Sequence, residues 1–228
     1  MILMLDSAMR ATGFMLGFAF VLQSLEHIRS FQNEQLIFLP RLLLALLLMA
    51  GFQPLWVTGG LLLLYIIALH RFQGPYNGGA DRMGLLILCC LFLAYLLPPG
   101  YWREVVFGYL ALQLLLSYFV AGLVKVVNPD WRSGTALCDV FRFSAYPVSE
   151  SLRVYADAPR LMWLMGWLVM ILELLFPLSM FAGRGLLVML GLTAAFHFAN
   201  ACLFGLNRFF WVWIAAYPSI LWLQSRIM

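Results

Sequence analysis

Apolar residues fall into long stretches that short polar segments separate. A helix crosses a bilayer with about 20 apolar residues, and fewer are enough when polar residues at its ends reach the interface. By that measure, spanning helices are predicted over residues 8–24, 36–51, 54–70, 83–98, 105–127, 161–182, 186–206 and 208–225. The second and third stretches meet at Phe52-Gln53-Pro54, so they form either a tight hairpin or one broken element. The pattern therefore predicts seven or eight transmembrane helices.

The composition of the chain leads to the same fold class. Of the 228 residues, 64% are hydrophobic and 11% are charged, and the mean hydropathy is +0.93. Soluble domains are about half apolar and about a quarter charged, so a water-soluble core could not hide this much apolar surface. We expect an all-α, polytopic integral membrane helical bundle that forms a single domain over residues 1–228. Its surroundings are then a lipid bilayer, and we expect a multi-pass protein of the bacterial inner membrane.

Two polar segments, at about residues 71–82 and 128–160, are long for so apolar a chain. With eight spans they emerge on the same membrane face, which makes them the predicted functional loops. Eight of the arginines fall on that face and four on the other, so the positive-inside rule places the face in the cytoplasm. The net charge of +4 is typical of loops that face anionic lipid, and we expect no nucleic-acid partner.

Lys125 is the only lysine of the chain and lies near the end of the fifth predicted span. At 100° per residue, Tyr118, Ala121 and Gly122 share its face of the helix. The small residues would let another helix, or a flat ligand, approach closely. A lysine that is taken out of water can serve as a base, which an arginine cannot. The alternative is a lysine that extends to the membrane surface, because Asn128 follows three residues later.

Polar residues also lie within the two spans that follow residue 160, where they are costly. Pro177 lacks the N–H that would bond the Glu173 carbonyl. His197 lies at nearly the depth of Glu173, because the two residues are 11 and 13 positions from Arg184 in the connecting turn. We therefore predict a Glu173–His197 hydrogen bond, with Asn200 on the polar face of His197. The alternatives for this buried pair are a clamp between helices, proton transfer or ligand binding.

Counting residues along the predicted helices also places Lys125 and Glu173 at different depths in the membrane. Glu173 lies twelve residues inside its helix, about 18 Å deep at 1.5 Å per residue, whereas Lys125 is near the surface. We therefore expect Lys125 to pair with a carboxylate of the charged face. The candidates are Asp81, Asp130 and Asp139.

The cysteines do not indicate a metal site. Cys89, Cys90, Cys138 and Cys202 form no Cys-x-x-Cys pair, and the first two lie inside an apolar span. Buried small hydrophobic residues are favoured over a redox pair or a metal site. No metal is therefore predicted.

A longer motif surrounds the single lysine, in the segment Tyr118-Phe-Val-Ala-Gly-Leu-Val-Lys-Val-Val-Asn-Pro-Asp-Trp-Arg-Ser-Gly134. Three further stretches agree in order and spacing: Asn77-Gly-Gly-Ala-Asp81, Glu173-Leu-Leu-Phe-Pro177 and Phe196-His-Phe-Ala-Asn200. On these residues the chain resembles the HTTM family, the membrane domain shared with vitamin K-dependent γ-glutamyl carboxylase. The resemblance extends from about residue 71 to residue 217.

This resemblance implies a base and a cofactor. In the carboxylase family, a lysine just before the Asp-Trp deprotonates reduced vitamin K, and the oxygenated quinol then removes the γ-proton of a peptide glutamate. Lys125 matches that position, which implies a reduced quinone as cofactor and a peptide or protein as substrate. The carboxylase works on the exoplasmic face, which opposes the orientation given by the arginines. The residues implied around the cofactor are Tyr118, Ala121, Gly122, Trp131 and Arg132, and those implied beside the base are Asp81 and Asp130.

Two classes of function follow from these features. The first is a carboxylase-like lyase or another quinol-dependent enzyme of the membrane, with Lys125 as the base. The second is a non-catalytic membrane subunit that anchors or assembles a larger complex, in which the polar residues hold helices together. The single lysine and the ordered motifs favour the enzyme. The small size, without the large soluble region of the carboxylase, favours the subunit. Transport has support from Glu173, His197 and Asn200, but no internal repeat is visible.

Overall fold

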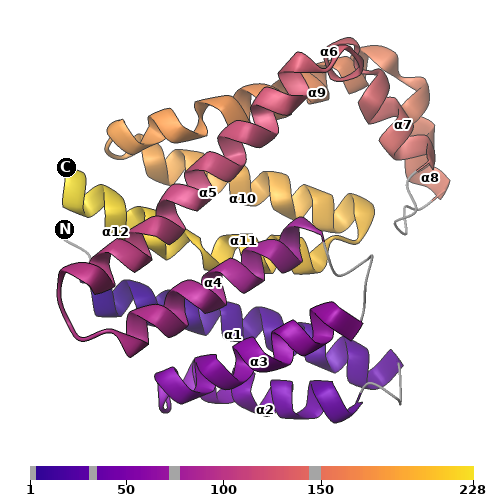
Figure 1. The fold of residues 1–228 in the computed structure, drawn as a ribbon. Coiled ribbons are helices and arrows are strands. Elements are labelled where there is room, and N and C mark those ends of the chain that lie inside the picture. The colour runs from indigo at the N-terminus through magenta and orange to yellow at the C-terminus, as the bar shows by residue number, and fades with distance from the viewer. Residues whose placement is uncertain (1–3, 31–34, 72–77, 144–149) are drawn as a thin grey trace. The chain divides into compact units, whose positions relative to one another are not determined.

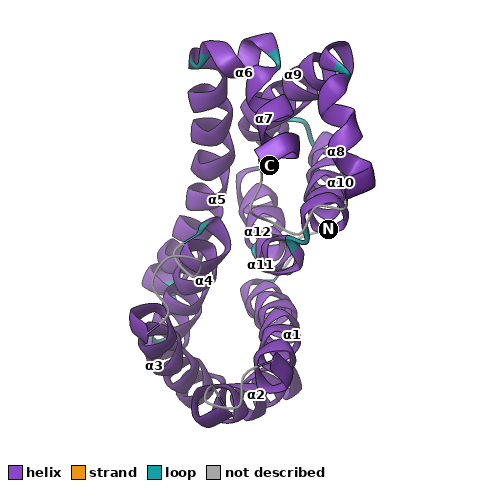
Figure 2. Ribbon diagram, turned by 90° about the vertical axis from the view of Figure 1, so that its right-hand side faces the viewer, coloured by secondary structure: helices purple, strands orange, loops and turns teal. Residues whose placement is uncertain are grey.

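The computed structural model describes residues 4–30, 35–71, 78–143 and 150–228. Almost all of these residues are helical (Figure 1), and none of them lies in a strand (Figure 2). The predicted all-α fold is thereby confirmed. Continuous helix suits so apolar a chain, because backbone N–H and C=O groups in lipid must be hydrogen-bonded within the segment that carries them.

The described helices cluster into two compact units. Unit one comprises the described residues of Met1–Leu112 together with Trp211–Ile227, and unit two comprises those of Gln113–Phe210. The helices that begin in unit one are α1 (Leu5–Ser30), α2 (Gln35–Ala50), α3 (Pro54–Arg71), α4 (Gly79–Leu96), α5 (Tyr101–Val127) and α12 (Tyr217–Ile227). Those that begin in unit two are α6 (Pro129–Ser133), α7 (Thr135–Phe143), α8 (Glu150–Arg153), η2 (Val154–Asp157), α9 (Pro159–Leu175), η3 (Phe176–Phe181), α10 (Gly185–Phe204) and α11 (Asn207–Ala215). The single domain predicted over the whole chain stays a prediction.

Six helical segments of the described residues are long and apolar enough to cross a membrane. They are Leu5–Arg29, Pro54–Arg71, Gly79–Leu96, Tyr101–Val127, Pro159–Phe181 and Gly185–Phe204. The apolar helix α2 is shorter, with 16 residues. The predicted span 208–225 is divided into α11 and α12, because Pro218 has no N–H to continue the helix from Ile214. The predicted count of seven or eight spans is therefore approximate.

Unit one is built from helices that follow one another along the chain. α1 packs against α2, α2 against α3, and α3 against α4, and α12 covers α1 (Figure 1). The turn between α2 and α3 spans only residues 51–53, which forces the two helices to run antiparallel. The buried core between them is apolar and includes Leu16, Phe20, Leu48 and Leu61.

Arg10 of α1 caps the C-terminal end of α2. One guanidinium nitrogen donates to the Leu48 carbonyl at 2.8 Å, and another donates to the Met49 carbonyl. These carbonyls belong to the last turn of the helix, where no N–H of the same helix follows to bond them. The positive charge is also favourable at the negative end of the helix dipole. The hairpin between α1 and α2 is therefore closed by a side chain as well as by apolar packing.

Arg10→Ala is expected to loosen this end of α2. The loss of hydrogen bonds from a charged donor costs about 1.5 kcal/mol, or roughly tenfold in the local opening equilibrium. Hydrogen exchange of the purified protein in detergent should then become roughly tenfold faster at the amides of residues 50–53. Arg184→Ala, which alters an exposed arginine of unit two, is the matched control and should leave those amides unchanged. Equal exchange in the parent and in the Arg10 variant would contradict the capping role.

In the segment predicted as a functional loop at residues 128–160, the described residues form short helices, and the functional role of the segment stays a prediction. The Asn128 side-chain oxygen accepts the Asp130 backbone N–H at 2.9 Å and caps α6. Gly134 ends α6 with φ +86°, and a Cβ atom there would lie 2.8 Å from the Trp163 backbone of α9. Glycine is therefore required at this turn for both its conformation and its packing.

Half of the other predicted loop at residues 71–82, namely residues 72–77, lies outside the described residues. Its described end belongs to α4, which begins at Gly79. Asp81 therefore lies in the first turn of a helix, where a negative charge is favourable.

Candidate functional site

Helices α5 and α9 approach each other closely at Gly122 of unit two. A Cβ atom at this position would lie 2.9 Å from Leu174 Cγ and 3.0 Å from both the Glu173 Cβ and the Leu174 backbone nitrogen. Ordinary contacts of a Cβ atom begin near 3.4 Å. Only a residue without a side chain therefore fits here. Of the two alternatives predicted for this face of α5, another helix or a flat ligand, a helix occupies the place beside Gly122.

Lys125 forms an ion pair with Glu173 across this contact. Its Nζ atom lies 2.8 Å from Oε1 and 2.7 Å from Oε2 of the carboxylate. The Glu173 side chain is 5% exposed and the Lys125 side chain is 19% exposed. The sequence predicted that Lys125 and Glu173 are separate and that Lys125 pairs with an aspartate. Both predictions are wrong, because Lys125 pairs with Glu173 and not with Asp81, Asp130 or Asp139 among the described residues.

The direction of the lysine side chain explains this error. A helical side chain leans toward the N-terminus of its helix, and Lys125 is near the C-terminus of α5. Its side chain therefore runs back along the helix, and Nζ lies 3.4 Å from the Ala121 carbonyl in the preceding turn. The depth of the α carbon, which was used for the prediction, is not the depth of the ammonium group.

A second buried polar pair joins α5 to α10, about two helical turns before Lys125 on α5. The Tyr118 hydroxyl lies 2.7 Å from His197 Nε2, and both side chains are buried. The Tyr118 ring packs on Phe176 with 4.1 Å between the ring centroids. In place of the predicted Glu173–His197 hydrogen bond, each of these residues has a partner on α5, since the Glu173 carboxylate bonds Lys125 and His197 Nε2 bonds Tyr118. His197 was correctly predicted to lie buried on the polar face of its helix, but its partner comes from α5.

The end of α9 agrees with the effect expected of Pro177. The regular helix ends at Leu175, and the chain continues in the tighter turns of η3. A proline nitrogen has no hydrogen to bond the carbonyl four residues earlier, which here belongs to Glu173. The charged pair therefore lies at the end of the regular part of α9.

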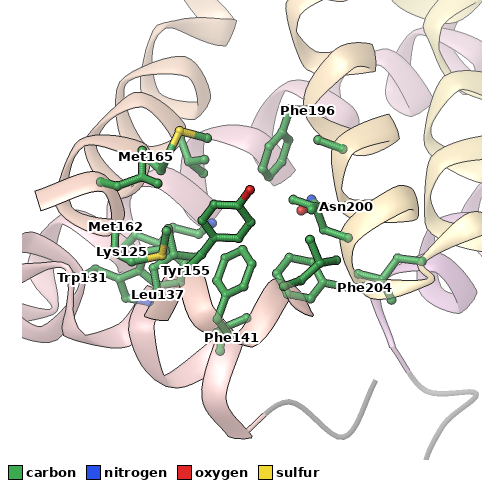
Figure 3. Close-up of a pocket in the computed structure, with 17 residues that line it drawn as sticks. Lys125, Trp131, Leu137, Phe141, Tyr155, Met162, Met165, Phe196, Asn200 and Phe204 are labelled. Atoms are coloured by element: carbon green, nitrogen blue, oxygen red, sulfur yellow. The ribbon is translucent and has the colours of Figure 1, made fainter. Parts of the chain in front are cut away.

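An apolar cavity of about 480 Å³ opens beside the charged pair, within unit two (Figure 3). Its walls come from α5, α6, α7, α8, η2, α9 and α10, and from Leu206. Lys125 is the one charged residue among the described residues that line it. The Lys125 Nζ also lies 5.4 Å from the centroid of the Trp131 ring, close enough for a cation–π contact. The arrangement can hold an apolar ligand against an amine.

The floor of the cavity is a small hydrophobic core. Phe141 of α7, Ala156 of η2, Met162 of α9 and Phe204 of α10 are buried against one another. Phe141 and Phe204 meet edge to face, with 5.0 Å between their ring centroids. This core fixes α7, the amphipathic helix that was missed at the sequence level, as a wall of the cavity.

Four of the other predicted site residues lie in α6 and α10. Trp131 and Asn200 line the cavity. Arg132 is exposed, and its carbonyl accepts a hydrogen bond from Trp167 Nε1 at 3.3 Å, which fastens α6 to α9. Asp130 is exposed at the start of α6. The structure therefore brings Lys125, Trp131 and Asn200 to one cavity, while Arg132 and Asp130 contact other parts of unit two.

Asp81 belongs to a separate buried polar cluster in unit one. The Tyr65 hydroxyl donates to the Asp81 carbonyl at 3.1 Å and approaches its Oδ1 atom at 3.4 Å. The Tyr65 ring in turn lies 5.0 Å from the Arg41 guanidinium carbon. Asp81 is therefore a member of the core of unit one, and its predicted role beside the base stays a prediction.

Sequence reasoning missed the buried Arg41. It is 1% exposed, donates to Gln23 Oε1 at 2.7 Å, and has its guanidinium carbon 4.3 Å from the Phe20 ring centroid. A lone arginine within the apolar run of α2 was the signal that could have found it, since charges inside spans are expensive. Arg41 and Gln23 join α1 to α2, and this pair is a structural clamp of unit one.

The described residues contain no group of three or more His, Cys, Asp or Glu side chains that could hold a metal ion. Cys89, Cys90, Cys138 and Cys202 are free thiols.

Fold and site together define a multi-pass α-helical membrane protein with a charged pair beside an apolar cavity. A family model for the HTTM domain matches residues 99–223, more than half of the 228 residues. The chain therefore belongs to the HTTM family, as its motifs indicated, and this domain is a membrane domain of the carboxylase family. The match includes the whole of unit two, with Lys125 and Glu173. No curated protein and no solved structure matches the chain significantly.

Proposed function

We propose that this HTTM protein binds a lipid-soluble quinol in the cavity of unit two and acts on a peptide or protein partner, with Lys125 as the base. The observation that supports this most directly is the position of the Lys125 amine at an otherwise apolar cavity. Ligand cavities typically measure about 300–1,000 Å³, are largely apolar and contain a few polar groups that fix orientation. The residues present fit a flat apolar ring with a hydroxyl group to be deprotonated.

Each contact of Lys125 has a role in this proposal. The Trp131 ring beside Nζ offers a flat surface for a ring, and the Glu173 carboxylate holds the lysine in place. As an ammonium, Lys125 cannot take up a proton. We propose that Glu173 accepts one proton from Lys125 Nζ along their hydrogen bond, and that the neutral amine then takes the proton of the quinol hydroxyl. A bound reduced quinone would supply the strong base that oxygenation of its ring generates.

Lys125→Met and Lys125→Arg test this proposal. Binding of a short-chain naphthoquinol to the purified protein in detergent should weaken at least tenfold in Lys125→Met, because the amine is lost from the cavity. Quinol-dependent oxygen uptake should be lost in both variants, since a guanidinium group stays protonated and cannot act as a base. Arg184→Met removes an exposed positive charge from the same unit and is the matched control for both measurements.

Two results would contradict the assignment. Full oxygen uptake by Lys125→Arg would show that Lys125 is not a base. Equal naphthoquinol binding by the parent and Lys125→Met would show that the cavity beside Lys125 is not the binding site.

The second candidate is a membrane subunit that anchors or assembles a larger complex. The observation that favours it is the burial of the Lys125–Glu173 pair between α5 and α9, where it also acts as a clamp. In that case the protein should be isolated from its native membrane in a stoichiometric complex. Lys125→Met should then weaken that complex, and addition of naphthoquinol should have no effect on it.

A further inference from the structure

Besides Lys125 and the indole of Trp131, two polar side chains line the cavity. They are the amide of Asn200 on α10 and the hydroxyl of Tyr155 on η2. None of the hydrogen bonds among the described residues involves either side-chain group. The remaining residues of the lining are almost entirely apolar. The polar groups of this cavity are therefore few enough for each to be assigned a role.

The C-terminal end of α10 is capped through the backbone of Asn200. Its carbonyl accepts the N–H groups of Gly205 and Leu206, which close the end of α10. The side chain does not contribute to that cap. An amide facing an apolar surface without a partner costs about 1–3 kcal/mol, and a ligand that accepts its hydrogen bond would recover this cost.

Asn200 and Lys125 face the cavity from opposite sides. In Figure 3 the Asn200 amide points inward from α10, while Lys125 and Trp131 lie across the cavity. The Tyr155 hydroxyl extends into the space between them. Apolar side chains such as Met162, Met165 and Phe196 fill the intervening wall.

We propose that Asn200 determines specificity at this site by hydrogen-bonding a second oxygen of the ligand, on the edge opposite the oxygen that faces Lys125, with the Tyr155 hydroxyl as an additional donor. The inference rests on the proposed function and assigns the residue that binds the second oxygen of its ligand. Through Asn200 the cavity favours a ring with oxygens on two opposite edges over a ring with one. A lipid with a single carboxylate, or a ring with a single oxygen, leaves the Asn200 amide unpaired and binds less well.

The test compares two ligands of equal size in binding to the purified protein in detergent. One is a 1,4-naphthoquinone with a short apolar tail, and the other is a 1-tetralone with the same tail, which has one carbonyl in place of two. Asn200→Leu should weaken binding of the naphthoquinone about tenfold and change tetralone binding less than twofold. Tyr155→Phe should show the same preference with a smaller effect. Asn207→Leu, at an exposed asparagine outside the cavity, should bind both ligands as the parent does.

The outcomes separate this inference from the function on which it rests. If Lys125→Met weakens naphthoquinone binding but Asn200→Leu weakens both ligands equally, the proposed role of Asn200 is overturned and the quinol site is retained. If the parent binds neither ligand, or Lys125→Met binds as the parent does, the quinol site itself is overturned. Asn200→Ala removes the amide without adding bulk, and it gives the same comparison if Asn200→Leu fails to fold.

Discussion

Lys125→Met is expected to lower the free energy of unfolding of the protein by about 3 kcal/mol. The substitution leaves the Glu173 carboxylate between α5 and α9 without its lysine, and both of its hydrogen bonds among the described residues are lost. Breaking a buried ion pair by removing one partner typically costs about 3–5 kcal/mol, because the remaining charge is desolvated and uncompensated. The lower end applies here since Lys125 is partly exposed.

Glu173→Leu, which removes the other partner of the ion pair, should lower the free energy of unfolding by less than Lys125→Met does. In Glu173→Leu the remaining charge belongs to Lys125, whose flexible side chain can turn toward the membrane surface. The double variant Lys125→Met/Glu173→Leu should recover most of the stability, because an apolar pair replaces a desolvated one. Unfolding by denaturing detergent, followed by far-ultraviolet circular dichroism, measures all three variants. Glu104→Gln breaks the exposed pair with Arg226 and, as the matched control, should cost less than about 1 kcal/mol.

The double variant also separates the two proposed functions. If it is stable but no longer binds naphthoquinol, the charged pair is maintained for the ligand at the expense of stability. Two single variants as stable as the parent would mean that the pair contributes nothing to the packing of α5 on α9.

The apolar pattern was enough to predict the membrane fold because the bilayer sets a simple rule. About 20 apolar residues form a helix that satisfies its own backbone, whatever its neighbours are. The pattern failed for the predicted span 208–225, where a proline interrupts the helix. Pro218 interrupts a stretch that is apolar throughout, and hydropathy alone does not register a missing N–H.

The polar composition of residues 128–160 predicts a loop. The helix signals of this segment were nevertheless present, since Asn128-Pro129 is a strong helix start and Gly134 a strong helix end. Leu137, Val140 and Phe141 then repeat at helical spacing and line the cavity from α7. The periodicity of the apolar residues indicates helix α7, although the many charged residues of the segment favour a loop.

The sequence predicted which residues belong to the candidate site, but it did not predict which of them bond to each other. Lys125, Glu173 and His197 were selected because ionisable groups inside spans are costly. Their partners depend on side-chain direction and on how α5 crosses α9, and neither follows from residue counting. Tyr118 was predicted as a neighbour of Lys125 on α5 and as a residue implied around the cofactor, whereas its bond to His197 depends on the position of α10.

Gly122→Leu is expected to lower the free energy of unfolding by roughly 3 kcal/mol, the upper end of the range for overpacking. The clash involves the backbone nitrogen of Leu174 as well as side chains, so α9 itself has to move. Gly122→Ala should have a smaller effect, because alanine favours helix over glycine by about 1 kcal/mol and offsets part of the strain. Gly191→Ala on α10 is the matched control, since a Cβ atom there has no neighbour within 4 Å and should leave stability unchanged or raised.

The same substitution also tests whether the charged pair depends on this crossing. Glu173 is one of the residues that a Cβ atom at position 122 would displace, so its carboxylate should move away from Lys125. Naphthoquinol binding should therefore weaken in Gly122→Leu although no residue of the cavity lining is changed. Adding Glu173→Leu to Gly122→Leu should then cost less than Glu173→Leu costs alone, because the ion pair is already broken. Additive costs would mean that the pair forms independently of the close approach at Gly122.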